Sequence, residues 1–288
     1  MASSFKFSKK TKIVAAILVV LLLLVVTAVK NINKQENQND FIEFIDVGQG
    51  DSALIYSNGY TALIDTGTPN SATSISKTLK GYNIDNLDVI ILSHPHDDHI
   101  GSAEFVLEEF GADNIIFSDI LPADDDNAAA LKNIKDTAEY VGAECHYAKE
   151  GMVINIGNFK LTVLFSDENA EDENNMSIVL MAENDGNKFL FTGDAEQDCE
   201  RKIIEQNINI DCDVLKVGHH GSRTSTSQEL LNIATPRYSI ISCGIDNSYG
   251  HPHDAVVKRL QNTGTTILRT DKKGNITCKI VNGKIVIE

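Results

Sequence analysis

Apolar and polar residues follow two different patterns along residues 41–288. Short apolar runs and strict alternation are typical of strands, whereas apolar residues three and four positions apart are typical of helices. The interleaving of both patterns predicts stacked layers of mixed strands and helices. Strands are expected over 41–47, 52–56, 61–64, 89–92, 115–117, 160–165, 177–181, 188–191, 214–217, 238–241, 276–281 and 284–287. Helices are expected over 74–79, 104–110, 127–140, 196–206, 228–233 and 255–261.

Chemically reactive residues follow directly after four of the expected strands. They are Asp65, a histidine-rich loop that begins at His94, Asp194, and the pair His219-His220. In a fold of stacked layers, the loops that follow strands gather at one edge. We therefore expect a single site to which several strand ends contribute.

The first forty residues have a different character. Residues 13–29 contain one polar residue and follow four lysines without any acidic residue. A run of this length is near the lower limit for a helix that spans a membrane, and basic residues before it keep that end in the cytoplasm. We expect a cytoplasmic basic segment over 1–12, a transmembrane signal anchor over 13–29, a polar stalk over 30–40 and an extracytoplasmic domain over 41–288. The alternative is a signal peptide cleaved after Ala28, which would release the domain.

Composition narrows the classes of function. The chain carries a formal net charge of −16, which speaks against broad, non-specific binding of DNA, because such binding needs lysine and arginine to displace counterions. A phosphate substrate stays open, since metal ions can supply positive charge locally. The five cysteines include no C-x-x-C pair, so we expect no disulfide framework despite the predicted export.

Seven of the eight histidines lie in three short clusters, and the first cluster reads His94-x-His96-x-Asp98-His99. Imidazole nitrogens and carboxylate oxygens are ligands of zinc, iron and manganese. His94 and His96 alternate, so their side chains point the same way if the backbone is extended. Asp98 and His99 lie past the turn and can face a second ion. The spacing therefore predicts a metal site on a loop between a strand and a helix.

These blocks together resemble the metallo-β-lactamase superfamily. More narrowly, the sequences at 46–52, 93–99, 216–222 and 249–253 resemble the soluble catalytic domain of the competence protein ComEC and its free-standing relatives. The resemblance covers nearly all of 41–288. It implies an α+β fold, a four-layer αββα sandwich of two mixed sheets flanked by helices, with a dinuclear metal site along its edge.

The resemblance also implies ligands for two divalent metal ions. His94 and His96 would bind the first ion, and Asp98 and His99 would bind the second. Asp194 would bridge both ions, which makes it the centre of the expected site.

The remaining ligands are less determined. His219 or His220 would complete the second site; we take His219 as the ligand and His220 as a residue that orients phosphate, although the spacing does not decide between them. Asp65 would orient a ligand histidine from behind. Many superfamily members have a further histidine before the bridging aspartate, but here the matching region offers Asn175 or a water. A site poorer in nitrogen favours manganese or another hard ion over zinc, so both metals stay open.

Such a site supports hydrolysis, because two metal ions that share a water lower its pKa. Asp98 belongs to this machinery as a ligand, and His251 and His253 are expected to protonate the leaving oxygen. Arg223 suits a bidentate contact with phosphate. Asp51 lies in a tight loop that either contacts the substrate or metals or is a purely structural turn.

Three functions remain open at this stage. The first is a membrane-anchored, extracytoplasmic, metal-dependent phosphodiesterase or nuclease, with DNA as a candidate substrate, although one apolar segment cannot form a DNA channel. The second is an esterase of wall or lipid-headgroup phosphates, similar to the choline-phosphate esterases that share the His-Pro-His-x-Asp-His block. The third is a metal-binding surface protein without catalysis.

Overall fold

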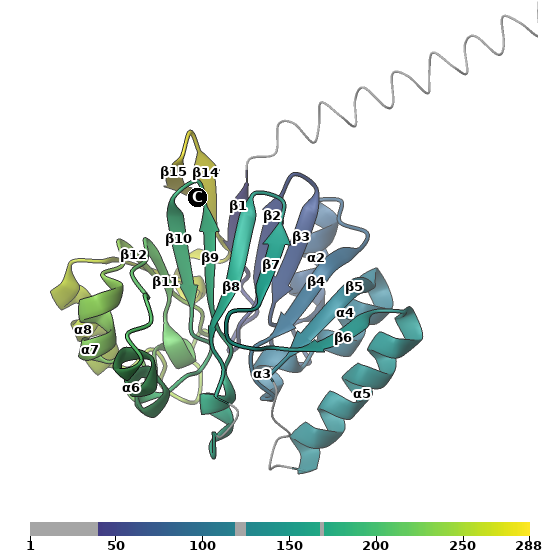
Figure 1. Ribbon diagram of the computed structural model, residues 1–288, viewed down its shortest axis with the longest axis horizontal. Coiled ribbons are helices and arrows are strands. Elements are labelled where there is room, and N and C mark those ends of the chain that lie inside the picture. Colours follow the sequence, from purple (N-terminus) through teal and green to yellow (C-terminus); the bar gives the residue numbers. More distant parts are fainter. Residues whose placement is uncertain (1–39, 119–124, 168–169) are drawn as a thin grey trace, which may run out of the picture. The chain divides into compact units, whose positions relative to one another are not determined.

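The computed structural model describes residues 40–118, 125–167 and 170–288 (Figure 1). The anchor expected over 13–29 and nearly all of the stalk expected over 30–40 lie outside the described residues. Within the described ranges, no helix is both long enough and apolar enough to cross a membrane. All described residues belong to a single unit of the chain.

The described strands form two mixed sheets (Figure 1). The first sheet has the strand order β15-β14-β1-β2-β3-β4-β5-β6, and the second has the order β13-β12-β11-β10-β9-β8-β7. The strands of the first sheet are β1 (Phe41–Phe44), β2 (Ala53–Ser57), β3 (Tyr60–Ile64), β4 (Leu87–Leu92), β5 (Ala112–Phe117), β6 (Glu144–Tyr147), β14 (Ile276–Val281) and β15 (Lys284–Ile287). Those of the second sheet are β7 (Val153–Ile156), β8 (Phe159–Phe165), β9 (Val179–Asn184), β10 (Asn187–Phe191), β11 (Val214–Lys216), β12 (Tyr238–Ile241) and β13 (Thr266–Arg269).

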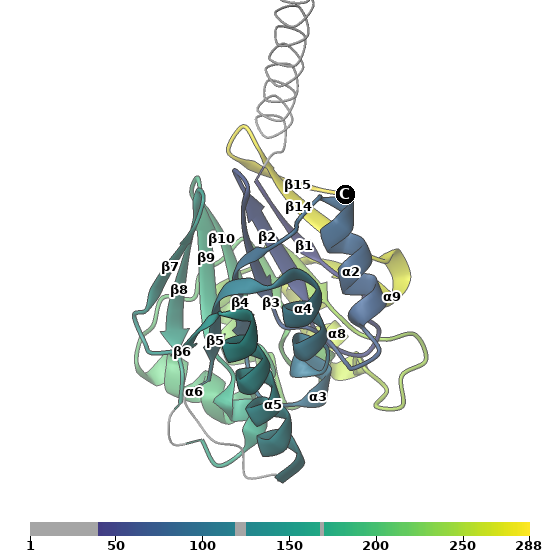
Figure 2. The same cartoon turned by 90° about the vertical axis from the view of Figure 1, so that its right-hand side faces the viewer.

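Helices cover the outer faces of both sheets (Figures 1 and 2). Helices α2, α4 and α5 pack on the first sheet, and α6, α7 and α8 pack on the second. The described helices are α2 (Ala72–Gly81), α3 (Asp97–Ile100), α4 (Ala103–Phe110), α5 (Asp125–Val141), α6 (Gln197–Glu205), α7 (Gln228–Ala234), α8 (Asp254–Thr263), α9 (Thr270–Lys273) and the 3-10 helices η1 (Glu173–Met176) and η2 (Gly218–Gly221).

Apolar side chains fill three layers, one between the sheets and one under each group of helices. Side chains of a strand alternate between its two faces. Strand β1 accordingly sends Ile42 and Phe44 into the space between the sheets and Phe41 under the helices. The ring of Phe44 stacks on that of Phe191 from the second sheet, with centroids 5.8 Å apart. The helix–sheet–sheet–helix order confirms the α+β sandwich that the sequence led us to expect.

The expected strands and helices of residues 41–288 all have counterparts, with ends that differ by a few residues. The strand expected over 41–47 is shorter and ends at Phe44. The pattern missed the strands β6, β7 and β13, and each of them lies at the edge of its sheet. Most side chains of β6 and half of those of β7 are exposed, so these strands lack the apolar run that identifies a strand.

The direction of the strands determines where the reactive loops emerge. Strands β3 to β6 run parallel in the first sheet, as do β10 to β13 in the second. The carboxyl ends of neighbouring parallel strands meet at one edge, and ligands bind there in open α/β sheets. The loops with Asp65 and His94 therefore leave the first sheet side by side, and those with Asp194 and His220 leave the second.

The inter-sheet layer should dominate the stability of the domain. Phe189 is fully buried there and packs edge-on against Phe159, with ring centroids 6.2 Å apart. We expect Phe189→Ala to lower the free energy of unfolding by about 3–5 kcal/mol, because it leaves a cavity between the sheets. Tyr140, which is 88% exposed on α5, gives the control. Tyr140→Ala should change the free energy of unfolding by less than about 0.5 kcal/mol. Equal effects of the two changes in denaturant unfolding would contradict this packing.

Candidate metal centre

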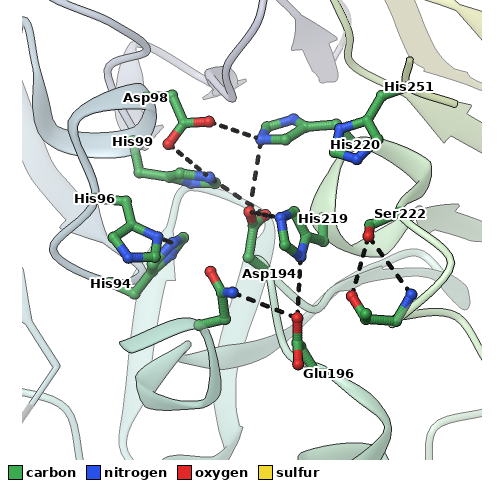
Figure 3. Close-up of polar contacts among 12 residues, drawn as sticks. His94, His96, Asp98, His99, Asp194, Glu196, His219, His220, Ser222 and His251 are labelled. Carbon is green, nitrogen blue, oxygen red and sulfur yellow. Dashed lines mark hydrogen bonds and ion pairs between the residues drawn. The ribbon is translucent and has the colours of Figure 1, made fainter. Parts of the chain in front are cut away.

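The loop after β4 brings two imidazole nitrogens together. His94 is buried, and its Nε2 lies 3.1 Å from Nδ1 of His96. His96 immediately precedes α3 and has an extended backbone, which lets both rings point to the same side. A separation of 3.1 Å between two ring nitrogens suits two ligands of one metal ion. Figure 3 shows these rings beside the other histidines and carboxylates of the site.

His99 is held from behind by a buried carboxylate. Its side chain is fully buried on α3, and its Nδ1 lies 2.8 Å from Oδ2 of Asp65. The same carboxylate accepts hydrogen bonds from the backbone N–H and the hydroxyl of Ser93, at 2.7 and 2.8 Å. These contacts fix the ring and leave Nε2 pointing towards Asp194. Asp65 therefore lies directly behind the ring of His99.

Asp194 lies at the centre of the cluster (Figure 3). Its Oδ1 is 3.2 Å from Nε2 of His99. Its Oδ2 is 3.6 Å from Nε2 of His219 and also 3.6 Å from Nε2 of His220. One carboxylate thus faces ring nitrogens from two different loops with its two oxygens.

The turn before Asp194 accepts only glycine. Gly193 has a φ of +51°, and a Cβ there would lie 2.8 Å from the hydroxyl of Ser177. That hydroxyl accepts a hydrogen bond from the backbone N–H of Asp194 at 2.9 Å. Gly193 therefore lets the chain turn tightly at the end of β10 and holds the carboxylate in place.

The pair His219-His220 lies on η2 in a strained turn. Both residues adopt left-handed backbone angles, with φ of 48° and 52°, which costs roughly 1–2 kcal/mol each for residues other than glycine. The turn directs His220 inward: it is 1% exposed, and its Nε2 lies 3.1 Å from Oδ2 of Asp98. His219 is more exposed, and its Nδ1 lies 3.5 Å from Oε1 of Glu196. The structure thus brings His220, and not His219, next to Asp98, which differs from the assignment made from the sequence.

A buried ion pair supports His220 from behind. Lys216, at the end of β11, donates to Oδ2 of Asp51 at 2.6 Å, and both side chains are buried. Oδ1 of Asp51 lies 3.3 Å from Nδ1 of His220, which is also 3.1 Å from the carbonyl oxygen of Ser242. Burial alone would raise the pKa of Asp51, but Lys216 and His220 lower it to about 2. Asp51 therefore lies against His220, and Lys216 is a buried partner of Asp51 to which the sequence gave no role.

Four buried atoms of the cluster have no partner with hydrogen-bond geometry. They are Nε2 of His99, Oδ1 of Asp194, Oδ1 of Asp51 and Nδ1 of His219. The first two lie 3.2 Å apart but are not aligned as a hydrogen bond. Buried polar atoms are normally paired, and leaving one unpaired costs about 1–3 kcal/mol. Imidazole nitrogens and carboxylate oxygens suit divalent ions of zinc, iron or manganese. Groups of three such ligand atoms within 4.8 Å of one another include His94-His99-Asp194, Asp98-His99-His220 and Asp51-Asp194-His220. The residues present therefore fit metal ions.

The charges of the cluster also favour a bound cation. Burial lowers the pKa of His99, but Asp194 and Asp65 outweigh burial and raise the pKa well above its usual value. Burial likewise lowers the pKa of His220, but Asp194 and Asp51 outweigh burial and raise this pKa to about 10. The carboxylates thus attract positive charge to both rings. A divalent metal would supply that charge and displace the protons.

An open pocket of about 370 Å³ lies over the cluster, with Asp194, His219, His220 and His251 among its lining. His251 is 9% exposed, and burial together with His220 and His219 lowers its pKa to about 4. The ring is therefore neutral at pH 7 and is not the charged acid that a leaving-group role would use most directly.

His253 and Arg223 do not line this pocket in the part of the chain that the structure describes. Nδ1 of His253 instead accepts a hydrogen bond from the backbone N–H of Arg223 at 3.0 Å, and Arg223 is exposed. Both residues thus stabilise the loop after η2 rather than face the cluster.

The region of the absent histidine contains two asparagines on η1. Oδ1 of Asn175 accepts a hydrogen bond from the backbone N–H of Glu196 at 3.0 Å, so its amide oxygen is already engaged. Asn174 lines the pocket, and its Oδ1 is buried without a hydrogen-bond partner. The asparagine that lines the pocket is therefore Asn174, one residue before the position expected.

The sequence matches a known protein family and several curated proteins. A family model described as "Metallo-beta-lactamase superfamily" matches residues 45–245. "ComE operon protein 3" of Bacillus subtilis is 33% identical over 261 residues, which cover 84% of this chain and 33% of that protein. "Competence protein ComA" of Neisseria gonorrhoeae is 31% identical over 242 residues, which cover 83% of this chain and 32% of that protein. The chain thus spans about a third of the length of these curated relatives.

Solved structures show the same fold at low sequence identity. The metallo-beta-lactamase fold protein YhfI from Bacillus subtilis superimposes with a TM-score of 0.53 at 15% identity, covering 80% of this chain and 95% of its own. CmlA, a diiron β-hydroxylase from Streptomyces venezuelae, superimposes with a TM-score of 0.56 at 13% identity, covering 84% of this chain and 54% of its own. At such identities the likeness shows the fold alone.

Metal binding at this cluster should stabilise the fold. A ligand that binds only the folded state adds about 2.7 kcal/mol at a hundredfold excess over its dissociation constant. We expect the free energy of unfolding to be higher by about this amount with Mn²⁺ or Zn²⁺ than with EDTA. Asp194→Asn should remove most of this increase. Asp198→Asn, at an exposed carboxylate on α6, is the control and should keep it. An undiminished gain in Asp194→Asn would contradict the assignment.

The Lys216–Asp51 pair should be sensitive to the loss of one partner. Lys216→Met leaves the Asp51 carboxylate buried with its main partner gone, and we expect it to cost about 3–5 kcal/mol in EDTA. The exposed pair Lys132–Asp136 is the matched control, and Lys132→Met should cost less than about 1 kcal/mol. Denaturant unfolding of both variants measures the difference, and similar costs would show that the buried pair does not hold the site together.

Proposed function

The chain belongs to the metallo-beta-lactamase superfamily and is related to competence proteins, and from this we propose that it hydrolyses phosphodiesters at a centre of two divalent metal ions. The observation that carries the proposal is the central position of Asp194, whose two oxygens face histidines of two loops at the floor of an open pocket. When bound, the metal ions supply Lewis acidity and lower the pKa of a water molecule.

The distances support a division of the ligands into two groups. His94 and His96 converge on one point, and His99 and His220 both lie next to Asp98. We therefore assign His220 instead of His219 to the second ion. The proposed ligands are His94, His96 and Asp194 for the first ion, and Asp98, His99, His220 and Asp194 for the second.

The surrounding residues would hold these ligands in position. Asp65 fixes the ring of His99, and Asp51 with Lys216 fixes that of His220. Such supporting contacts determine which ring nitrogen carries the proton and which is free to bind metal. Neither ring then needs to reorganise when substrate enters the pocket.

His251 is proposed to donate a hydrogen bond to a phosphate oxygen. The backbone N–H of Gly244 donates to Oε1 of Gln49 at 3.2 Å, so the amide nitrogen of Gln49 faces the other way, 3.4 Å from Nδ1 of His251. Nδ1 therefore accepts a hydrogen bond, and the neutral ring carries its proton on Nε2. This tautomer offers an N–H donor at the pocket wall, which suits an oxygen that gains negative charge during hydrolysis.

The proposed class of substrate rests on the relatives, and the proposed metal rests on the asparagine at the pocket. Two relatives are named as competence and recombination proteins, which supports a nucleic-acid phosphodiester. Asparagine in place of a histidine at the pocket supports a harder metal such as manganese. The net charge of −16 means that the protein surface contributes little to binding a polyanion, so affinity would come from the metal ions and the pocket.

A headgroup phosphoesterase is the second candidate. The exposed carboxylate of Asp97 lines the pocket, and it would favour a substrate with a positively charged group rather than a polyanion. With the apolar segment 13–29 as an anchor, the domain would then act on phosphoesters at the outer surface of the membrane.

Three substrates offered in parallel separate the candidates. The full-length chain with Mn²⁺ or Zn²⁺ should cleave bis-p-nitrophenyl phosphate and single-stranded DNA but not a phosphorylcholine ester. Asp194→Asn should lower the rate of hydrolysis by more than the roughly 10- to 100-fold that is typical of a change at a supporting residue. Asp198→Asn should remain active. Cleavage of the choline ester alone would select the second candidate. If wild type and Asp194→Asn behave alike on all three, neither candidate holds.

A further inference from the structure

The loop between β12 and α8 exposes two large apolar side chains. Ile245 is 72% exposed and Tyr249 is 65% exposed. Tyr249 lines the same pocket as Asp194. The ring of Tyr249 packs against that of His251, and its exposed side is available to a ligand in the pocket.

Tyr249 ends a column of three rings that leads outward from the metal cluster. The rings of His220 and His251 are 6.1 Å apart and inclined by 29°. The rings of His251 and Tyr249 are 5.7 Å apart and inclined by 21°. Figure 3 shows His251 beside His220 at the cluster. Because Tyr249 is covered by His251 on one face and is largely exposed, its other face is open to solvent.

The side chain of Asn247 holds this loop in shape. Its Nδ2 donates to the carbonyl oxygens of Gly244 and His251, at 2.9 and 2.7 Å. Its Oδ1 accepts from the backbone N–H of His251 at 2.9 Å. These hydrogen bonds join the two ends of the loop, so Tyr249 is presented on a closed turn with little conformational entropy left to lose on binding.

Within the ranges that the structure describes, the pocket lining contains neither lysine nor arginine with which to hold a phosphate backbone. The usual electrostatic source of affinity for nucleic acid is therefore absent beside the cluster. Stacking on an aromatic ring is the other common source, and it works for every base because each base has a flat π face.

We propose that Tyr249 is a stacking platform for a nucleobase that neighbours the scissile phosphate. The inference rests on the proposed phosphodiesterase function and narrows its substrate to a single strand, since a base within a duplex is already stacked and cannot reach the ring. Tyr249 would act on the binding of the substrate and not on the chemical step. Its loss should therefore raise KM more than it lowers kcat.

Two oligonucleotides of equal length and charge test the platform, one of thymidines and one of abasic sites. For wild type, KM should be roughly 5- to 150-fold lower for the thymidine strand than for the abasic strand, the range expected for one stacked base. Tyr249→Ala should reduce this preference to about one. Tyr249→Phe retains the ring and should retain the preference. Tyr140→Ala, at an exposed tyrosine on α5, is the control for an unspecific effect and should also retain it.

The possible results separate the platform from the function on which it rests. A wild-type preference that survives in Tyr249→Ala would overturn the platform and leave the phosphodiesterase standing. If Tyr249→Ala raises KM for a phosphorylcholine ester but not for the thymidine strand, the nucleobase platform is overturned. The ring would then bind a cationic headgroup. If wild type cleaves neither oligonucleotide while bis-p-nitrophenyl phosphate is hydrolysed, the nucleic-acid substrate and the platform both fail.

Discussion

The buried carboxylate of Asp194 is the constraint around which the rest of the structure is arranged. It is 1% exposed, and three other carboxylates of the site, those of Asp51, Asp65 and Asp98, lie close by. Buried charges of one sign are stable only when opposite charges accompany them. Lys216 and the histidines meet part of this need, and divalent metal ions would meet the rest. The clustered negative charge that destabilises the folded state would therefore also attract metal ions.

The fold brings these groups together by the direction of its strands. Parallel strands in both sheets deliver their carboxyl ends to one edge, and each end continues into a tight turn. Several of those turns use left-handed backbone angles, at Asp65, His219 and His220. The inter-sheet and helix–sheet apolar layers hold the strands rigidly enough to maintain this strain. Packing far from the pocket is thus a condition for the geometry of the ligands.

Much of this could be predicted from the sequence, and the failures have physical causes. Apolar runs identified the central strands, whereas β6, β7 and β13 lie at sheet edges and carry weaker patterns. The edge strand β15 was found because Asn282-Gly283 marks its hairpin. Spacing indicated that His219 or His220 joins the site, but only the burial of His220 and its contact with Asp98 show which ring points inward. The positions of Lys216 and Asn174 at the site were missed because they arise from contacts between distant segments, which no local pattern contains.

The central claim is that two metal ions share Asp194, and electron paramagnetic resonance of the Mn²⁺-loaded chain tests it most directly. Two manganese ions roughly 3.5–4 Å apart are coupled through their bridging ligand. If two ions share Asp194, the chain binds two Mn²⁺ and gives the multiline spectrum of a coupled pair. One bound ion, or two ions with the six-line spectrum of isolated Mn²⁺, would contradict it.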